Sequence, residues 1–436
     1  MARRASYPGI AVGEQIAEET LFMKDPVRTR RHATWALVIY VGFGWVKPVA
    51  AQTGSLLLQT VSPGQSIQAA INKATEGGWI FVQPGTYQET SDPTNGLNIS
   101  RGVHLVGLST STAKVVINNS GGQRNGIAAV PAAHANCMSC HSDLAPPFPL
   151  LPGVNKTVPT QPVINNLSIS GITLQNFANN GLFTSNVNGF AFLDVHVVGS
   201  KSYGIFPTLS QNGLISFSSV SGTDDTGIWI ETSQNVTATN NLVEDNVVGV
   251  EVSNSQDILL ADNESRGNSI GVAVIFLPGL FASRPDTKRI TVRGNHVHDN
   301  NKANTASGSI LATIPASLGI VYFGSDDSLI TANVVENNNL SGIAIADYCL
   351  AVAGGPFDCS TDPAITPGFV ADNGASNNRV TLNRLSNNGK NPGVSNPFAF
   401  AAGDISLLTA ADNGNCFTDN TFASFFSTLG ILPKCH

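Results

Sequence analysis

The 436-residue chain carries little charge and few aromatic side chains. Charged residues make up 12% and aromatic residues 7%, and the net charge is −7. This balance leaves no basic surface for DNA or RNA, so nucleic acid is excluded as an expected partner. No segment keeps the 3.6-residue period of an amphipathic helix over several turns. The 42 glycines, with many Asn, Ser and Thr residues, are instead typical of short strands joined by turns.

Residues 1–51 are predicted to be a leader and signal peptide. An apolar run at 33–46 follows four basic residues and precedes a small-residue cleavage site ending at Ala51; the basic residues are Lys24, Arg28, Arg30 and Arg31. The apolar run is shorter than the roughly 20 residues of a spanning helix, and no later run is longer. We therefore expect an exported protein, periplasmic or extracellular, with no membrane span in the mature chain.

A glycine recurs through the middle of the chain, mostly every 22 or 23 residues, at Gly181, Gly204, Gly227, Gly249, Gly271, Gly319 and Gly342. The longer gap before Gly319 indicates either two repeats or one repeat with an inserted loop. A constant period of this length is typical of a solenoid, and the β-branched, alternating sequence favours strands over helices.

The residues after each glycine predict which side chains face the interior. The first position is always aliphatic: Leu182, Ile205, Ile228, Val250, Val272, Ile320 and Ile343. The second is mixed: Phe183, Phe206, Trp229, Glu251, Ala273, Val321 and Ala344. Since successive strand residues point to opposite faces, the first column should stack inside and the second should point outward. Asparagines at Asn240, Asn263, Asn295 and Asn383 form an expected turn column.

The segment "SIQAAINKATEGGWIFVQPGTY" is similar to the opening of the pectin-lyase-like superfamily, and residues 203–279 resemble exported parallel β-helix repeat proteins. The resemblance implies an all-β, right-handed parallel β-helix with rungs of about 22–24 residues. A helix over about 66–74 is expected to cap its N-terminal end. The single domain would span 52–436, with an insertion at about 127–160 and a loop-rich C-terminal cap at about 347–436.

The superfamily includes polysaccharide lyases, glycosidases and alginate epimerases. The resemblance therefore implies an exported protein that binds an acidic polysaccharide and, as a lyase or uronate epimerase, cleaves or epimerises it. The sequence lacks an Asp-Pro-His motif, and this departure weighs against lyase or epimerase activity. The alternatives are a non-enzymatic periplasmic scaffold carrying a c-type haem and a purely structural surface protein.

The repeat is least uniform at 208–266, where aromatic rings and carboxylates are expected on neighbouring rungs. A ring can cover the apolar face of a sugar, while carboxylates bind hydroxyls, move protons or hold Ca²⁺. The candidate catalytic or Ca²⁺-binding residues are Asp224, Asp225, Glu251 and Lys201. The candidate substrate-binding residues are Phe206, Trp229, Glu231 and Arg266, with Lys288 or Arg289 as a further base or charge clamp. The alternative is that the Asp residues cap turns and the outward carboxylates only keep the protein soluble.

Two further motifs predict metal or cofactor binding. His296 and His298 share a strand face beside Asp299, which suggests a metal site or a solvated rung edge. Cys137, Cys140 and His141 have the C-x-x-C-H spacing of c-type haem attachment. A zinc site that includes His134 and a simple Cys137–Cys140 disulfide are the alternatives. The other four cysteines are expected to form two local disulfides, Cys349–Cys359 and Cys416–Cys435.

Overall fold

The computed structural model describes residues 58–119, 121–132, 163–277, 286–306, 310–348, 374–393 and 396–436. These residues all belong to one compact unit, Ser55–His436. Several predictions fall outside the described residues: the leader at 1–51, the haem or zinc motif of His134, Cys137, Cys140 and His141, and the Cys349–Cys359 disulfide. Among the described helices, none has the length and apolar character needed to cross a membrane.

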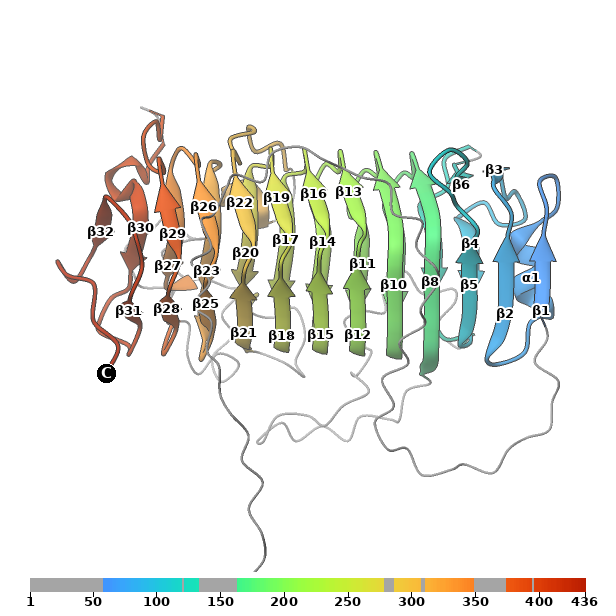
Figure 1. The fold of residues 1–436 in the computed structure, drawn as a ribbon, viewed down its shortest axis with the longest axis horizontal. Helices are drawn as coiled ribbons and strands as arrows, with labels where there is room; N and C mark the ends of the chain where they lie inside the picture. Colours follow the sequence, from blue (N-terminus) through green and yellow to red (C-terminus); the bar gives the residue numbers. More distant parts are fainter. Residues whose placement is uncertain are drawn as a thin grey trace, which may run out of the picture. The chain divides into compact units, whose positions relative to one another are not determined.

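The chain winds into a parallel β-helix whose rungs stack along one axis, so that strands far apart in sequence lie side by side (Figure 1). The first sheet contains β1 (Leu58–Val61), β2 (Gly78–Val82), β3 (Gly85–Tyr87), β5 (Val103–Gly107), β6 (Val115–Asn118), β8 (Ile164–Gln175), β10 (Val187–Val198), β12 (Gln211–Ser216), β13 (Ser219–Ser221), β15 (Gln234–Thr239), β16 (Leu242–Glu244), β18 (Gln256–Ala261), β19 (Glu264–Arg266), β21 (Thr287–Arg293), β22 (His296–His298), β24 (Ser325–Asp326), β25 (Leu329–Thr331), β26 (Val334–Glu336), β28 (Arg379–Thr381), β29 (Arg384–Ser386) and β31 (Cys416–Thr418).

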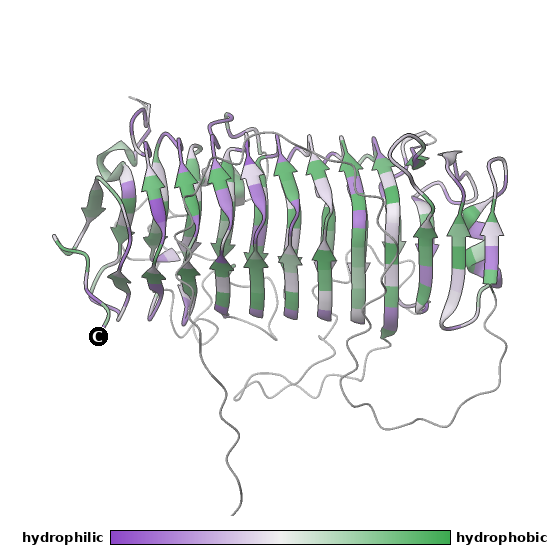
Figure 2. Cartoon of the chain, in the orientation of Figure 1, coloured by the Kyte–Doolittle hydropathy of each residue, from purple (hydrophilic) through white to green (hydrophobic). Residues whose placement is uncertain are grey.

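The second sheet contains β4 (Asn95–Ile99), β7 (Asn125–Ala129), β9 (Asn180–Ser185), β11 (Ile205–Thr208), β14 (Thr226–Glu231), β17 (Val248–Ser253), β20 (Ile270–Ile275), β23 (Leu318–Phe323), β27 (Ser341–Ala346), β30 (Gly403–Leu408) and β32 (Phe425–Ser427). Short helical segments are α1 (Ile67–Lys73), η3 (Ile310–Thr313) and η4 (Ala399–Ala401). Hydrophobic and hydrophilic residues share most strands of both sheets (Figure 2).

The predicted aliphatic column fills the interior between the sheets. Ile228 of β14 lies beside Ile205 and Val250 on the neighbouring strands. All seven members of the column are buried in one hydrophobic core. The glycine before each aliphatic residue lies where the rungs pack closely, which leaves no room for a side chain. A Cβ at Gly249 would lie 2.3 Å from Ser265 Oγ and 2.5 Å from the Gly271 carbonyl oxygen. The long gap before Gly319 is one rung with an inserted loop, since β20 pairs directly with β23.

Buried asparagines form hydrogen-bonded ladders at the corners of the rungs. Asn263 Nδ2 donates to Asn295 Oδ1 at 2.9 Å, and Asn333 Nδ2 donates to Asn383 Oδ1 at the same distance. Each side chain also bonds backbone groups of adjacent rungs, so the ladder satisfies polar groups that would otherwise be buried without partners. The prediction was wrong by one residue at Asn240. The ladder continues through Asn241, whereas Asn240 has a φ of 56° and its amide nitrogen bonds Thr239.

At the start of the described chain, helix α1 forms where the sequence predicted it. Ser66 is its N-cap and accepts a hydrogen bond from the Ala69 N–H, while Ala74 is its C-cap. The Glu89 carboxylate accepts hydrogen bonds from the Ser66 hydroxyl and the Ile67 N–H, which ties the helix to the chain after β3. The role of α1 in closing the end of the solenoid stays a prediction.

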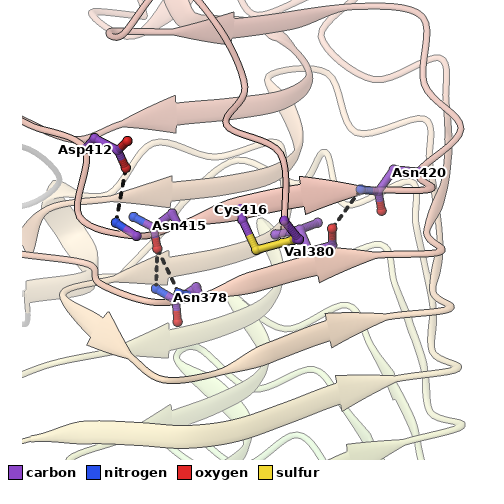
Figure 3. The surroundings of a disulfide bond; sticks show 8 residues. Asn378, Val380, Asp412, Asn415, Cys416 and Asn420 are labelled. Atoms are coloured by element: carbon purple, nitrogen blue, oxygen red, sulfur yellow. Dashed lines mark hydrogen bonds between the residues drawn. A yellow bond between two sulfur atoms is a disulfide. The ribbon is translucent and has the colours of Figure 1, made fainter.

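The C-terminal region that was predicted to be a loop-rich cap also contains strands that belong to the two sheets. Within its described residues, β28 to β32 continue the stack, with β30 paired to β27 and β31 paired to β28. The repeat was hard to see here because loops of unequal length separate the strands. The predicted Cys416–Cys435 disulfide is confirmed, and it lies close to Val380 and Asn415 (Figure 3).

The insertion predicted at about 127–160 begins later than expected. Residues 127–129 belong to β7, which pairs with β9 and so forms a regular part of the second sheet. The next described strand, β8, begins at Ile164. The Cys-bearing segment therefore interrupts the chain between a strand of the second sheet and a strand of the first.

Candidate functional site on the second sheet

Aromatic side chains form a column on the outer face of the second sheet. Phe183, Phe206 and Trp229 lie on successive strands β9, β11 and β14, with ring centroids 5.5 Å and then 4.5 Å apart. The Phe206 and Trp229 planes differ by only 5°. Glu251 of β17 is the next member of the column, opposite Trp229. The predicted alignment of Phe206, Trp229 and Glu251 is therefore confirmed.

This outer face is not a solvated surface, contrary to the alternative considered from sequence. Phe206 is 5% exposed, Glu231 3% and Glu251 2%. Trp229 is half-buried, and its indole N–H donates to Ser253 Oγ at 2.7 Å. Glu231 and Glu251 thus point away from the interior of the solenoid, as predicted, but they do not keep it soluble. Strand alternation gives the direction of a side chain and does not determine what packs over it.

Three carboxyl groups lie around this column. Thr208 Oγ1 donates to Glu231 at 2.7 Å, while Thr226 Oγ1 bonds Asp225 at 3.1 Å and Glu251 at 2.9 Å. Burial raises the pKa of Asp225 to about 6 and the pKa of Glu231 to about 7. The pKa of Glu251 is also raised, first by burial and then by the charges of Asp225 and Glu231. Carboxyl groups with such pKa values can donate protons as well as accept them near neutral pH.

Tyr203 is a member of the site that the sequence analysis missed. Its ring centroid lies 4.8 Å from that of Phe206 and 4.6 Å from that of Trp229. Burial raises its pKa above the ordinary value, with further contributions from Asp225, Glu251 and Glu231. Tyr203 directly precedes Gly204, the position that Thr226 holds before Gly227. The residue type at this position varies from rung to rung, so the sequence carries no pattern that points to either side chain.

Lys201 and Asp224 lie at the exposed rim of the site. Lys201 Nζ is 3.4 Å from Asp224 Oδ2, and the two side chains are 66% and 59% exposed. An exposed ion pair such as this one is weak, because water and salt screen it. A ligand can therefore reach both side chains and replace the contact between them. The described groups that a ligand can reach are therefore the rim pair and the half-buried Tyr203, Asp225 and Trp229.

The remaining cationic candidates lie on the first sheet. Arg266 ends β19, where its guanidinium bonds Glu244 and Glu264 at 2.8 Å each. Lys288 and Arg289 lie in β21 and pair with Asp286 and Asp257. The expected grouping of Arg266 with Trp229 was wrong, because a rung has two sheets and a spacing of 15 residues from Glu251 to Arg266 carries the chain from one sheet to the other.

Within the described part of the chain, neither the histidine pair nor the proposed Ca²⁺ ligands belong to a group of three metal-binding side chains. His296 and His298 share one face as predicted, with ring centroids 4.0 Å apart. His296 bonds Glu336 on the following rung, whereas His298 lies near Glu264 on the preceding one. Throughout the described segments, no three His, Cys, Asp or Glu side chains are grouped to hold a metal ion. Calcium at Asp224, Asp225 and Glu251 stays a prediction.

The chain is a right-handed parallel β-helix protein. A family model described as "Right handed beta helix region" matches residues 162–277, which include the aromatic column and its carboxyl groups. The match confirms the fold that the sequence resemblance implied. No curated protein sequence matches this chain.

Two solved structures share the fold over most of their length. The A-module of the Azotobacter vinelandii mannuronan C-5 epimerase AlgE4 is 17% identical, with a TM-score of 0.55 over 85% of this chain and 94% of that one. The A-module of AlgE6, an epimerase of the same name and organism, is 15% identical, with a TM-score of 0.52 over 84% and 92%. At this identity, the likeness establishes the fold and not the activity.

Proposed function

We propose that this chain is an exported protein that binds an acidic polysaccharide on the outer face of the second sheet. The observation that carries the proposal is the meeting of half-buried aromatic rings, Tyr203 and Trp229, with the carboxyl group of Asp225. An aromatic ring packs against the apolar face of a pyranose, and the polar groups around it bind hydroxyls. The shared fold adds support, since the two similar structures are named for acting on mannuronan.

The charge of the site is compatible with an acidic polymer at weakly acidic pH. A carboxyl whose pKa is about 6 or 7 is largely protonated below that value, so it repels a uronate carboxylate less and can donate a hydrogen bond to it. Lys201 at the rim supplies a positive charge. We therefore expect binding to strengthen as the pH falls from about 8 to about 5.

The finer proposal is that the site also cleaves or epimerises the polymer. Both reactions begin with removal of the proton α to the uronate carboxylate, which needs a base and a group that offsets the charge developing on that carboxylate. Asp225 is the half-buried candidate for proton transfer, and Lys201 is the exposed candidate for charge stabilisation. A Ca²⁺ ion between Asp224 and the substrate is a further proposal for that second task.

The test is a binding titration with polymannuronate and polygalacturonate, using uncharged dextran as the control polymer. Trp229→Ala is expected to weaken binding to the acidic polymers about tenfold or more, since loss of a stacked aromatic contact costs on the order of 1–2 kcal/mol. Asp225→Ala should weaken it as well. The matched control is Phe217→Ala, which removes an aromatic ring that is 65% exposed and lies in the bend between β12 and β13 of the first sheet.

A thermal melt of each variant separates loss of the ligand contact from loss of the fold. If Trp229→Ala and Asp225→Ala both remain folded and bind the polymers as the wild type does, the second-sheet face is not the binding site. Equal affinity for dextran would instead contradict the acidic substrate.

A further inference from the structure

Thr226 connects two carboxyl groups through a single hydroxyl. Its Oγ1 lies 3.1 Å from Asp225 Oδ1 and 2.9 Å from Glu251 Oε2, both within hydrogen-bond distance. Asp225 precedes Thr226 in the chain, whereas Glu251 comes from the next rung, on β17. The bridge is therefore formed by the stacking of rungs and by no local sequence motif.

Asp225 and Glu251 cannot both be ionised while each is hydrogen-bonded to the Thr226 hydroxyl. A threonine hydroxyl has one proton, so it donates a full hydrogen bond to one carboxylate only. It can bond the second carboxyl group as well if that group carries a proton and donates it to the hydroxyl oxygen. Two ionised carboxylates would leave one of these short contacts without a proton between the oxygens. Burial makes such a contact costly, because the charges are poorly screened.

Burial indicates which partner holds the proton. Glu251 is 2% exposed, whereas Asp225 is half-buried and closer to solvent. The ionised form of Glu251 is also disfavoured by Asp225 and Glu231, which raise its pKa in addition to the effect of burial. The more deeply buried acid is thus the neutral member of the pair, and Asp225 is the member that ionises first.

The described groups around the pair offer it no compensating positive charge. Glu231 on β14 is acidic and bonded to Thr208. The Tyr203 hydroxyl is held neutral by burial, which raises its pKa. Lys201 at the rim is exposed and paired with Asp224. On the far side along the column, the next side chain after Glu251 is Ala273, which carries no charge.

We propose that Asp225 and Glu251 share one proton across the Thr226 hydroxyl at neutral pH, and that loss of this proton at higher pH switches the site off. The second part rests on the proposed polysaccharide function, while the first does not. With the proton in place, the order of hydrogen bonds is Glu251 carboxylic acid to Thr226 oxygen, and Thr226 hydroxyl to Asp225 carboxylate. When Glu251 ionises, it ceases to donate, and two adjacent carboxylates repel each other next to Trp229 on the outer face of the second sheet.

The proton can be observed directly by infrared spectroscopy, since a protonated carboxylic acid has a carbonyl band that a carboxylate lacks. The wild type at about pH 7 should show a band that is absent from Glu251→Gln, whose amide keeps the shape and the donor of the neutral acid. Thr226→Val should keep the band but shift it, because the acid loses its hydrogen-bond acceptor. Glu244→Gln is the matched control on the first sheet and should leave the band unchanged.

Two results would overturn the shared proton. One is a neutral-pH spectrum in which Glu251→Gln removes no carboxylic acid band. The other is a band that Glu251→Gln removes but that Thr226→Val neither shifts nor abolishes, since the hydroxyl would then not be the bridge. Thermal melts confirm that each variant is folded before its spectrum is interpreted.

The switch is tested by polymannuronate binding across the same pH range. Wild-type affinity should fall at least tenfold as the band disappears at high pH, and Glu251→Gln should lose this dependence. A band without binding at any pH would refute the proposed function and leave the proton sharing intact. Binding with no band, or binding whose pH dependence persists in Glu251→Gln, would refute the switch and leave the proposed function intact.

Discussion

The two outer faces of the solenoid are built from the same strand alternation but have opposite character. On the first sheet, the outward charged residues of β16 and β19 are partly exposed and paired with each other, as Arg266 is with Glu244 and Glu264. On the second sheet, the outward residues of β11, β14 and β17 include the buried Phe206, Glu231 and Glu251 and the half-buried Trp229. The carboxyl groups of the two faces therefore have different electrostatic surroundings.

This difference shows that a carboxylate acquires unusual chemistry through what covers it and not through its place in the repeat. Glu244 lies beside a guanidinium and is partly exposed. Glu231 is 3% exposed, and its described side-chain partner is the neutral Thr208 hydroxyl. Desolvation without a cation disfavours the charged form, which is the usual origin of acids and bases that function near neutral pH.

The largest expected effect is that of removing the central ring of the second face. Trp229→Ala should lower the free energy of unfolding by about 3–5 kcal/mol, because the indole stacks on Phe206, contacts Tyr203 and bonds Ser253. Phe217→Ala, which removes an exposed ring, should change it by less than about 0.5 kcal/mol. Urea denaturation measures both. Equal losses in the two variants would mean that the second face is no better packed than the first.

An intermediate effect is expected from the buried acid Glu231, and it depends on pH. Its folded-state pKa of about 7 is above its unfolded value, so its stabilising contribution is present at low pH and is lost as the pH rises through about 7. Glu231→Gln removes this loss and should make the protein more stable than the wild type at about pH 8, by at most about 3 kcal/mol.

Thermal melts at several pH values measure this effect. Glu244→Gln on the first face is the control, and it should keep the wild-type fall in stability with rising pH. If the stability of Glu231→Gln depends on pH as that of the wild type does, ionising Glu231 in the folded protein costs no free energy. The carboxyl groups of the two faces would then not differ in their electrostatic surroundings.

The smallest expected effect is on the first face. Arg266→Ala breaks the ion pairs with Glu244 and Glu264, whose side chains are 31% and 41% exposed. Exposed pairs are screened by water and salt, so we expect a loss of about 0.5–1 kcal/mol that largely disappears at high ionic strength. Denaturation at low and high salt measures it. A loss of several kcal/mol that persists in salt would place Arg266 in a functionally or structurally critical network.

The parts of the fold that depend on regular spacing could be predicted from the sequence. The spacing of the repeat glycines predicted the aliphatic column in the interior. The alternation of side chains along a strand predicted that Phe206, Trp229 and Glu251 are aligned on the outer face. The position of α1 was also predicted to within one residue at each end, and the structure shows Ser66 as its N-cap. Each of these features is local or repeats at a fixed interval, so pattern and propensity are sufficient to locate it.

The parts that depend on contacts between rungs could not be predicted in this way. Tyr203 and Thr226 lie before the repeat glycines, at a position whose residue type varies from rung to rung, so no pattern identified them. Arg266 was grouped with Trp229 although it lies on the first sheet, because residue spacing alone does not give the corners of a rung. The rungs after residue 374 were missed because the loops between them break the period.

The sequence by itself determined that this chain is an all-β solenoid and which side chains point inward, because both follow from a fixed period and the alternation of a strand. Only the tertiary structure decided that an outward face is buried and that Asp225 and Glu251 meet at one hydroxyl. Burial and proton sharing depend on distances between residues of different rungs. Those distances are set by how the rungs stack and by what packs over them.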